Sequence, residues 1–488
     1  MKRNNLARNS FYNVCYKLLN MIFPLVTSIY VARILKADSI GRVAAAQNIV
    51  SYFTMIATMG IPIYGIKAIA QYEIGSKENE TTFFELFTIN AVLSVLSSVG
   101  YYLFITLSSY FDGKEFLYYI TGINVLFNIL NVDWYYQGIQ EYRYIAIRSF
   151  LVKLLSMLAL IIFVRGETDY ILYAFISSAA LVANYLFNII RLIKLIHKPD
   201  LGSLKIRRHI KHVLLLFVSN IAIEIYVLAD TTMLDYMTDS SIVGYYTVSL
   251  KVIRVIRNAV AAISAVFLPQ LSYSYNNNDE ATFLRLANRG ISILVTLSIP
   301  SALGLCMIAD DFITVFYGID YIESINTIRI LSFSIVSVAL SNFLGTQLFV
   351  TIGKEKITTL STICGAALNV TLNYLLIPKF LQNGAATASM LTELLVMLIQ
   401  VIMNRKYMNL SYGIWKPLIS SLCMCLAVFV IRRCIAISVV RLVVSCCVGA
   451  IVYFGVSYMI RNTFVIELVN FIKGRLYLKF VKKESDRN

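Results

Sequence analysis

Charged residues are scarce in this sequence, and histidine is rarer still. Of the 488 residues, 14% are charged and 58% are hydrophobic, whereas soluble domains usually contain about a quarter charged residues. So few charges cannot cover the surface of a soluble protein. The eight cysteines form no Cys-x-x-Cys pair, and the three histidines share one basic segment (His197, His209 and His212). No disulfide framework, metal site or cofactor is therefore expected.

The sequence consists largely of long apolar segments. A helix needs about 20 apolar residues to cross a bilayer, and only helices and closed barrels satisfy their backbone groups in lipid. The segments are continuous rather than alternating, which favours helices over a barrel. We therefore predict an all-α membrane protein with about fourteen transmembrane helices, at residues 11–32, 41–64, 84–107, 116–137, 149–164, 170–193, 212–234, 242–271, 288–309, 325–350, 357–378, 384–404, 416–432 and 439–460.

The distribution of charge predicts the orientation. The formal net charge is +16, which we attribute to cytoplasmic segments facing anionic lipid rather than to nucleic-acid binding. The connection at 191–211 is strongly basic, whereas those near 235–239 and 310–320 contain acids and no Lys or Arg. Both termini are therefore predicted to be cytoplasmic. Arg432, Arg433 and Arg441 fall on the opposite side, where only anchoring at the membrane interface would account for them.

A short motif occurs twice. Asp38-Ser39-Ile40-Gly41 begins the second span, and the segment from Asp239 to Gly244 begins the eighth. The match is either chance or the trace of an internal repeat, and a repeat would give two six-helix lobes of the same orientation, as in transporters. We place the lobes, two appended helices and a basic cytoplasmic tail at 1–200, 201–410, 411–465 and 466–488.

Three basic residues in the eighth span are the main functional candidates. Lys251, Arg254 and Arg257 recur every three residues, so they follow one side of a helix, with Arg254 about 18 Å deep. Each charge costs about 2.5–3.5 kcal/mol at the centre of a membrane helix. They need either acidic partners, for which Glu224 and Asp230 are candidates, or a hydrated cavity for phosphate-like anions. The sequence leaves both alternatives open.

Other charges lie singly in the predicted spans. Lys17 either extends to the membrane interface or faces the same cavity. Asp133 and Glu393 are acids that could hold a coupling ion. The sequence contains no phosphate-binding loop and no large soluble domain, so nucleotide hydrolysis is not expected.

Several short motifs spread over residues 5–410 are similar to those of a known family. They are Ile29 to Leu35 with Asp38 and Gly41, Trp134 to Tyr142, Asp230 to Leu234 with Gly244 to Tyr246, Leu268-Pro269, and Gly345-Thr346-Gln347. In this order they resemble bacterial polysaccharide flippases of the Wzx type, within the multidrug/oligosaccharidyl-lipid/polysaccharide exporter superfamily. The resemblance implies two six-helix lobes around a central cavity, followed by two further helices.

The resemblance also implies a function. Such a flippase moves undecaprenyl-diphosphate-linked oligosaccharide across the bacterial inner membrane by alternating access, for O-antigen, capsule or another surface polysaccharide. By position, Lys17, Lys251, Arg254 and Arg257 would meet the diphosphate or acidic sugars. The glycan and membrane lipids would be its partners, together with a polysaccharide polymerase and a chain-length regulator. No covalent chemistry is needed, so the protein is not expected to be an enzyme.

Other functions stay open. A cation-coupled multidrug exporter of the same superfamily would favour an acidic or apolar cavity over three central cations. A membrane-embedded glycosyltransferase, polymerase or ligase commonly has a large external loop or a soluble domain, and neither is visible. A non-transporting member of an assembly complex is a third alternative.

The predicted orientation can be tested by labelling single cysteines in a cysteine-free background. A membrane-impermeant thiol reagent added outside should label Asp239→Cys and not Ser203→Cys, because basic connections stay on the cytoplasmic side. Labelling of Ser203→Cys alone would reverse the orientation.

Overall fold

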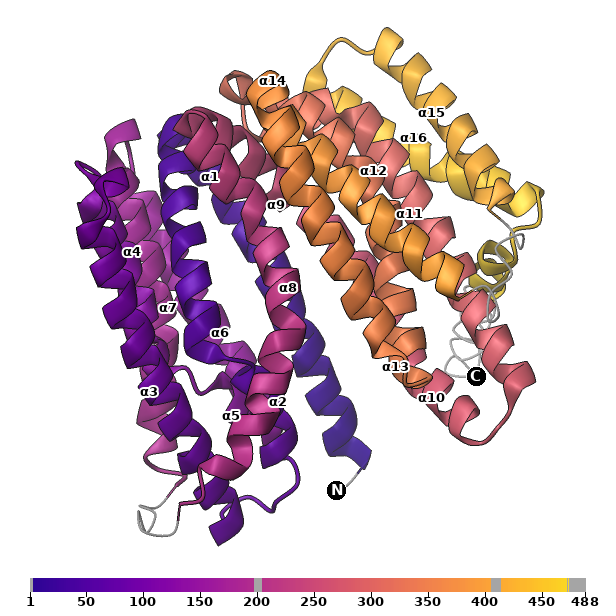
Figure 1. Cartoon of the computed structure of the whole chain (residues 1–488). Coiled ribbons are helices and arrows are strands. Elements are labelled where there is room, and N and C mark those ends of the chain that lie inside the picture. The colour runs from indigo at the N-terminus through magenta and orange to yellow at the C-terminus, as the bar shows by residue number, and fades with distance from the viewer. Residues whose placement is uncertain (1–2, 197–203, 405–413, 472, 474–488) are drawn as a thin grey trace, which may run out of the picture. The chain divides into compact units, whose positions relative to one another are not determined.

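The structure is a computed structural model that describes residues 3–196, 204–404, 414–471 and 473. In these ranges the chain forms helices and short connections, with no strand. Figure 1 shows the helices in order along the chain. They are α1 (Arg3–Thr58), α2 (Ile61–Ile69), α3 (Lys77–Leu107), α4 (Glu115–Leu126), α5 (Asp133–Gly138), α6 (Tyr142–Phe163), α7 (Tyr170–Leu192), α8 (Arg207–Met237), α9 (Ser240–Ser264), α10 (Leu268–Asn276), α11 (Glu280–Phe316), α12 (Ser324–Asn342), α13 (Phe349–Thr351), α14 (Glu355–Met403), α15 (Trp415–Cys434) and α16 (Ser438–Met459).

These helices confirm the predicted all-helical membrane fold. In the described ranges, 10 helical segments are long and apolar enough to cross a membrane. Two of them, α1 and α14, each contain two predicted spans joined at a kink, where Lys36 (φ 58°) and Leu381 (φ 50°) adopt left-handed backbone conformations. The two remaining predicted spans lie in α8 and in α4 with the turn that follows it. Each predicted span therefore has a helical counterpart.

Polar side chains fix the start of two long helices. Ser76 accepts a hydrogen bond from the Asn79 backbone N–H at 3.2 Å and caps α3. Asp279 accepts from the Thr282 N–H at 3.0 Å and caps α11. The first backbone N–H groups of a helix have no partner inside it, so such caps stabilise the helix start. The N–H of Thr282 also holds the pKa of Asp279 below its ordinary value.

The chain divides into two compact units, each described by itself. Unit 1 comprises residues 1–251 and 370–385, and unit 2 comprises residues 252–369 and 386–488. This division follows contact density and not repeat symmetry, so the lobe boundaries predicted near residues 200 and 410 stay a prediction. Ser203, the residue chosen for labelling, and most of the predicted basic tail lie outside the described residues.

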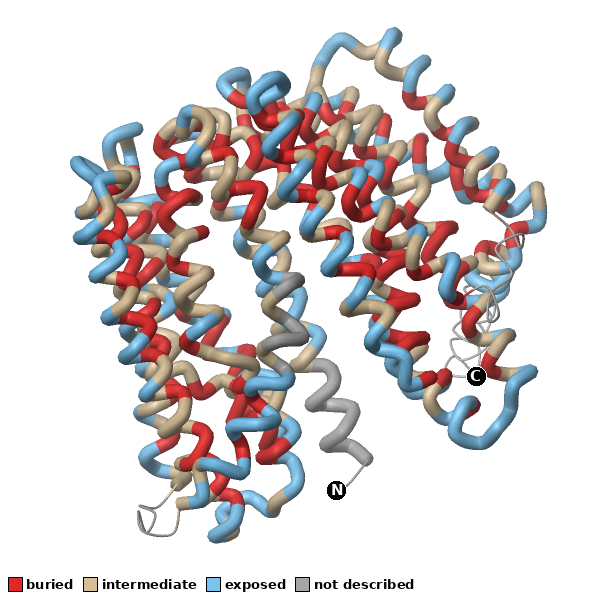
Figure 2. The backbone as a smooth tube through the Cα atoms, in the orientation of Figure 1, coloured by how far each residue is buried: buried red, intermediate tan, exposed pale blue. Residues whose placement is uncertain are grey.

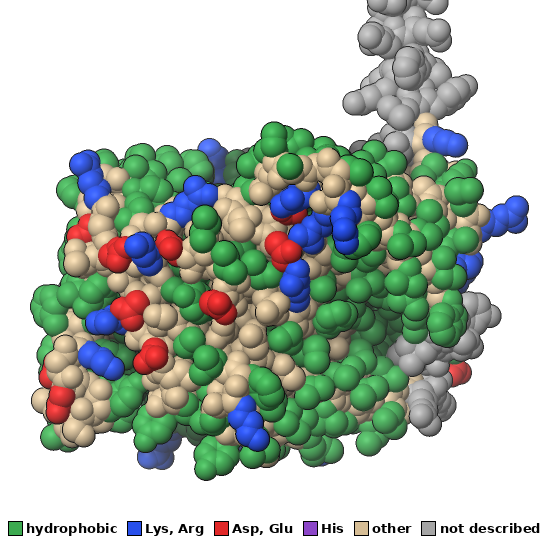
Figure 3. Space-filling view, turned by 90° about the horizontal axis from the view of Figure 1, so that it is seen from above, with side chains coloured by type: hydrophobic (Ala, Val, Ile, Leu, Met, Phe, Trp, Pro, Cys, Tyr) green, Lys and Arg blue, Asp and Glu red, His purple; other side chains and the backbone are tan. Residues whose placement is uncertain are grey.

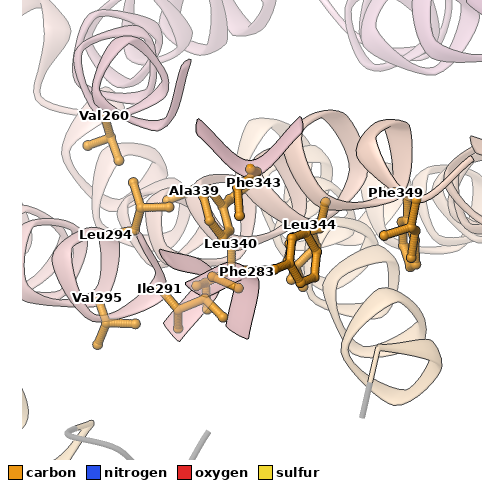
Figure 4. Packing of buried hydrophobic residues seen from close by; sticks show 14 residues of the cluster. Val260, Phe283, Ile291, Leu294, Val295, Ala339, Leu340, Phe343, Leu344 and Phe349 are labelled. Atoms are coloured by element: carbon orange, nitrogen blue, oxygen red, sulfur yellow. The ribbon is translucent and has the colours of Figure 1, made fainter. Parts of the chain in front are cut away.

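Each unit has its own apolar core. In unit 1, Phe83 stacks on Trp134 with ring centroids 5.5 Å apart. In unit 2, Phe283 and Phe343 belong to a cluster of side chains that come from α9 to α13 (Figure 4). Gly290 lies against the Phe343 ring, which leaves no room for a larger residue. Buried residues therefore recur along the long helices of both units (Figure 2).

Large apolar side chains are also exposed on both units. Leu107 is 81% exposed in unit 1 and Ile451 is 71% exposed in unit 2. In Figure 3, hydrophobic side chains surround the groups of charged side chains that lie on the visible face. Exposure of this kind is costly in water and not in lipid, so these surfaces fit a protein embedded in a bilayer.

The two copies of the repeated motif meet in unit 1. Gly41, on α1, and Gly244, on α9, lie where the two helix backbones touch. A Cβ atom added to Gly41 would overlap the Ser240 carbonyl oxygen, and one added to Gly244 would overlap the Ala37 carbonyl oxygen. Only glycine permits this close approach of the two backbones. This explains why both copies of the motif end in glycine.

Substitution of Gly41 by leucine should therefore destabilise the protein. The added side chain must force α1 away from α9, and overpacking of this kind costs about 1–3 kcal/mol. Gly455→Leu is the matched control, because a Cβ there meets open space on α16. The readouts are membrane abundance and the unfolding temperature in detergent. Equal unfolding temperatures for the two variants would contradict the α1–α9 contact.

Candidate functional site

The three predicted cations lie on one helix, α9. Lys251 is half-buried and Arg254 is exposed, and Arg257 is largely buried with 18% of its side chain accessible. Their spacing of three residues places them along one side of α9, as predicted. They therefore differ in accessibility along a single stripe.

Arg257 is held inside unit 2. One guanidinium nitrogen donates a hydrogen bond to the Ser334 hydroxyl on α12, and the other lies 3.7 Å from the Glu393 carboxylate on α14. Glu393 is 9% exposed, and sequence considerations offered it as the holder of a coupling ion. In the structure it faces an arginine instead. An opposite charge at this distance offsets part of the cost of burying both groups.

Asp230 is held inside unit 1. It is 5% exposed and accepts hydrogen bonds from the Tyr246 hydroxyl at 2.5 Å and from the Asn373 side-chain amide at 2.7 Å. Tyr246 lies on α9 and Asn373 on α14, in the part of that helix that belongs to unit 1. These neutral donors stabilise the carboxylate. The pairing of Asp230 with Arg254 stays a prediction.

Glu224 borders a cavity in unit 1. The cavity measures about 580 Å³ and lies among α1, the start of α2, α4, α7 and α8. Glu224 is exposed on α8, and Lys17 is exposed on the first part of α1. Lys17 is not among the described residues that line this cavity.

Asp133 belongs to a buried ion pair that the sequence did not reveal. Its carboxylate lies 2.9 Å from the guanidinium of Arg148, whose side chain is 5% exposed. The Asn188 amide bridges the two, donating to Asp133 at 2.6 Å and accepting from Arg148. The sequence offered Asp133 as a residue that could hold a coupling ion. In the structure the Arg148 guanidinium lies beside its carboxylate instead. We missed Arg148 because the fifth span was predicted to begin at residue 149, whereas α6 begins at Tyr142.

The unexplained arginines on α15 and α16 have acidic partners in unit 2. Arg432 lies 2.6 Å from the Asp310 carboxylate, and Arg441 pairs with Asp311, whose side chain is 0% exposed. Arg329 on α12 completes the group at 2.5 Å from Asp310. The pairs tie the two appended helices to α11. Interface anchoring is therefore unnecessary for Arg432 and Arg441.

A second cluster missed by the sequence analysis lies where the basic connection enters α8. Glu85, on α3, is fully buried and accepts from the Lys205 backbone N–H at 2.6 Å and from Arg208 at 2.8 Å. The His209 imidazole lies 2.6 Å from the same carboxylate and 2.9 Å from the Tyr64 hydroxyl. These bonds attach the end of the connection to α3. His209 is accounted for by this packing.

Comparison with known sequences identifies relatives over most of the chain. A family model described as polysaccharide biosynthesis protein matches residues 6–275, which is more than half of the chain. A candidate O-antigen transporter of Escherichia coli (strain K12) is 22% identical over 410 residues, covering 82% of this chain and 98% of that protein. One of Shigella dysenteriae is 21% identical over 394 residues, covering 78% and 95%.

Solved structures share the fold. The lipid II flippase MurJ, in an inward closed conformation, has a TM-score of 0.77 at 14% identity, covering 94% of this chain and 100% of that chain. An inward-facing multidrug resistance transporter of the MATE family has a TM-score of 0.61 at 14% identity, covering 81% and 97%. At such identities the likeness shows the fold alone, and it confirms the predicted fold class.

The pairing of Arg257 with Glu393 can be tested by a double-mutant cycle. Arg257→Gln and Glu393→Gln should each destabilise the protein by about 1–3 kcal/mol, since each leaves a buried charge uncompensated. The double variant should lose less than the sum of the two single losses. Arg289→Gln is the control, because its pair with Glu467 is 56% and 53% exposed and is worth about 1 kcal/mol or less. Strict additivity at Arg257 and Glu393 would contradict the pairing.

Proposed function

The chain belongs to the polysaccharide biosynthesis protein family, and from this premise we propose that it is a flippase for lipid-linked glycan. The predicted resemblance to Wzx-type flippases is thereby confirmed. In the proposed reaction, undecaprenyl-diphosphate-linked oligosaccharide crosses the bacterial inner membrane for assembly of a surface polysaccharide. Both termini would lie in the cytoplasm, and a polymerase and a chain-length regulator would act with it.

The cationic stripe on α9 is the observation that carries the proposal. The link between lipid and glycan would be a diphosphate, which needs positive charge to enter a membrane protein. Arg254 is exposed and Lys251 is half-buried, so a ligand can reach both, and Arg257 is largely buried beside Glu393. Cations within a membrane span are costly unless water, an acidic partner or an anionic ligand compensates them. We therefore assign diphosphate binding to Lys251 and Arg254, with Lys17 as a further candidate and Arg257 as a positioning residue.

The physical task fits alternating access. The lipid tail can stay in the bilayer, while the polar head has to cross about 30 Å of hydrocarbon. A hydrated, positively charged pathway that opens first to one side and then to the other lowers that barrier. No bond is made or broken, so the function requires no catalytic residue.

A multidrug exporter is the second candidate, because the MATE transporter in the comparison has the same fold. Its fold likeness does not extend to a substrate. Exported drugs are often cationic, and a helix with three cations at membrane depth would repel them. The charge of α9 therefore favours the glycan flippase.

The proposal is tested by complementing a deletion strain and staining its surface glycan. Arg254→Ala combined with Lys251→Ala should reduce glycan export by about tenfold or more, because charge-assisted contacts to the diphosphate are lost. Arg254→Lys should retain substantial export, since charge matters more than geometry in a hydrated site that must release its cargo.

Membrane abundance is measured in parallel, and Arg285→Ala, an exposed arginine at the start of α11, is the matched control. Wild-type export by a normally abundant double variant would refute the role assigned to α9. Sensitivity of the deletion strain to cationic drugs, with an intact surface glycan, would instead support the exporter.

A further inference from the structure

Unit 1 contains a cavity that the proposed role of α9 does not use. Its volume, about 580 Å³, is within the range of about 300–1,000 Å³ that is typical of small-molecule sites. The described residues that line it come from the second part of α1, the start of α2, α4, α7 and α8. None of the three α9 cations is among them.

The lining combines apolar side chains with several polar ones. Hydroxyl and amide side chains from three helices border the cavity: Gln47, Ser51, Thr54, Thr58, Asn124 and Ser177. The rings of Tyr185 and Phe217 border it too, and Glu224 is the one charged residue among the described lining residues. Polar groups inside a bilayer are costly unless water or a ligand satisfies them. The composition therefore indicates a ligand that forms many hydrogen bonds.

Two of the lining hydroxyls can only accept hydrogen bonds from a ligand, whereas the Gln47 amide and the Thr54 and Ser177 hydroxyls can donate as well as accept. The Ser51 hydroxyl donates to the backbone carbonyl of Gln47 at 2.8 Å, and the Thr58 hydroxyl donates to the backbone carbonyl of Thr54 at 3.0 Å. Each hydroxyl has used its only proton, so its oxygen can only accept.

Asn124 also lines the cavity. Its side-chain nitrogen donates to the Ser178 hydroxyl at 3.1 Å, while its Oδ1 atom is buried and accepts no hydrogen bond from any described residue. The Glu224 carboxylate, when ionised, is also an acceptor without a proton to give. A lining of hydrogen-bonding groups with one negative charge favours a ligand that is rich in hydroxyl groups and not anionic.

We propose that this cavity binds a neutral sugar unit through the hydroxyl groups of the sugar. The inference rests on the proposed glycan flippase and names the part of its cargo that unit 1 recognises. A sugar ring offers O–H donors to Ser51, Thr58 and Glu224, and its hydroxyl oxygens can accept from Gln47, Thr54 and Ser177. Its C–H faces can pack on Tyr185 and Phe217, which supply flat apolar surface with little entropy cost. A uronate or a phosphate would be repelled by Glu224.

The test measures binding to the purified full-length protein in nanodiscs by saturation-transfer NMR. The probes are free glucose, galactose, mannose, N-acetylglucosamine and N-acetylgalactosamine, with glucuronate and tetraphenylphosphonium as the anionic and cationic comparisons. At least one neutral sugar should bind more tightly than glucuronate. Asn124→Leu should weaken that binding about 3- to 10-fold, the worth of one hydrogen bond.

Asn184→Leu is the matched control. It makes the same change on α7 in unit 1, at a residue that is not among those lining the cavity, and it should bind the sugar like the wild type. Glu224→Lys should shift the preference toward glucuronate, and Glu224 is exposed, so its replacement leaves the core intact. The unfolding temperature of every variant is measured to confirm folding.

The inference fails if no neutral sugar binds, or if Asn124→Leu and Asn184→Leu bind it equally. Binding of tetraphenylphosphonium that depends on Glu224, without sugar binding, would assign the cavity to organic cations. These results leave the flippase proposal untouched, because that proposal is decided by glycan export in the α9 variants. If the α9 variants export glycan like the wild type while the cavity still binds the sugar, the role assigned to α9 is refuted and the sugar site stands.

Discussion

A charge buried in a hydrocarbon layer needs a partner close by, and much of the polar packing of this protein follows from that constraint. Removing one partner of a buried ion pair destabilises a protein, because the remaining charge is left without compensation. Asp133 with Arg148 in unit 1 and Glu393 with Arg257 in unit 2 satisfy the constraint across helices. The first pair joins the consecutive helices α5 and α6, whereas the second joins α9 to α14 far along the chain, so the charges also select which helices pack together.

The same constraint explains how the last two helices attach. Neither hydrophobic force nor a long connection can hold a helix at one position in lipid, since the lipid tails are as apolar as the helix surface. Asp311 is fully buried and paired with Arg441, and Asp310 is shared by Arg432 and Arg329. The acids of α11 therefore specify where α15 and α16 bind. Asp310 and Asp311, which the sequence analysis used only to assign orientation, have this structural role as well.

The helices could be predicted from the sequence because hydrophobicity along the chain is a local property. The kinks could not: Lys36 and Leu381 take left-handed conformations without the glycine that usually marks them. The cations of α9 were visible because three charges in one apolar run are conspicuous. Their partners were not, since Ser334 and Glu393 lie about 80 and 140 residues further along the chain, and residue spacing carries no information on contacts between helices. The cavity of unit 1 was invisible for the same reason, because it is assembled from separate segments.

The two proposed binding regions make opposite demands on a ligand. The α9 stripe favours negative charge, whereas the cavity bordered by Asn124 and Glu224 favours neutral ligands rich in hydroxyl groups and disfavours anions. A small anion could satisfy only the first and a free sugar only the second. A lipid-linked glycan carries both an anionic linkage and neutral hydroxyl-rich units in one molecule, so it can satisfy both. Each region need then bind only weakly, because linked weak contacts combine into useful affinity and can still be released one at a time. A transporter that has to let go of its cargo on the far side gains from that division.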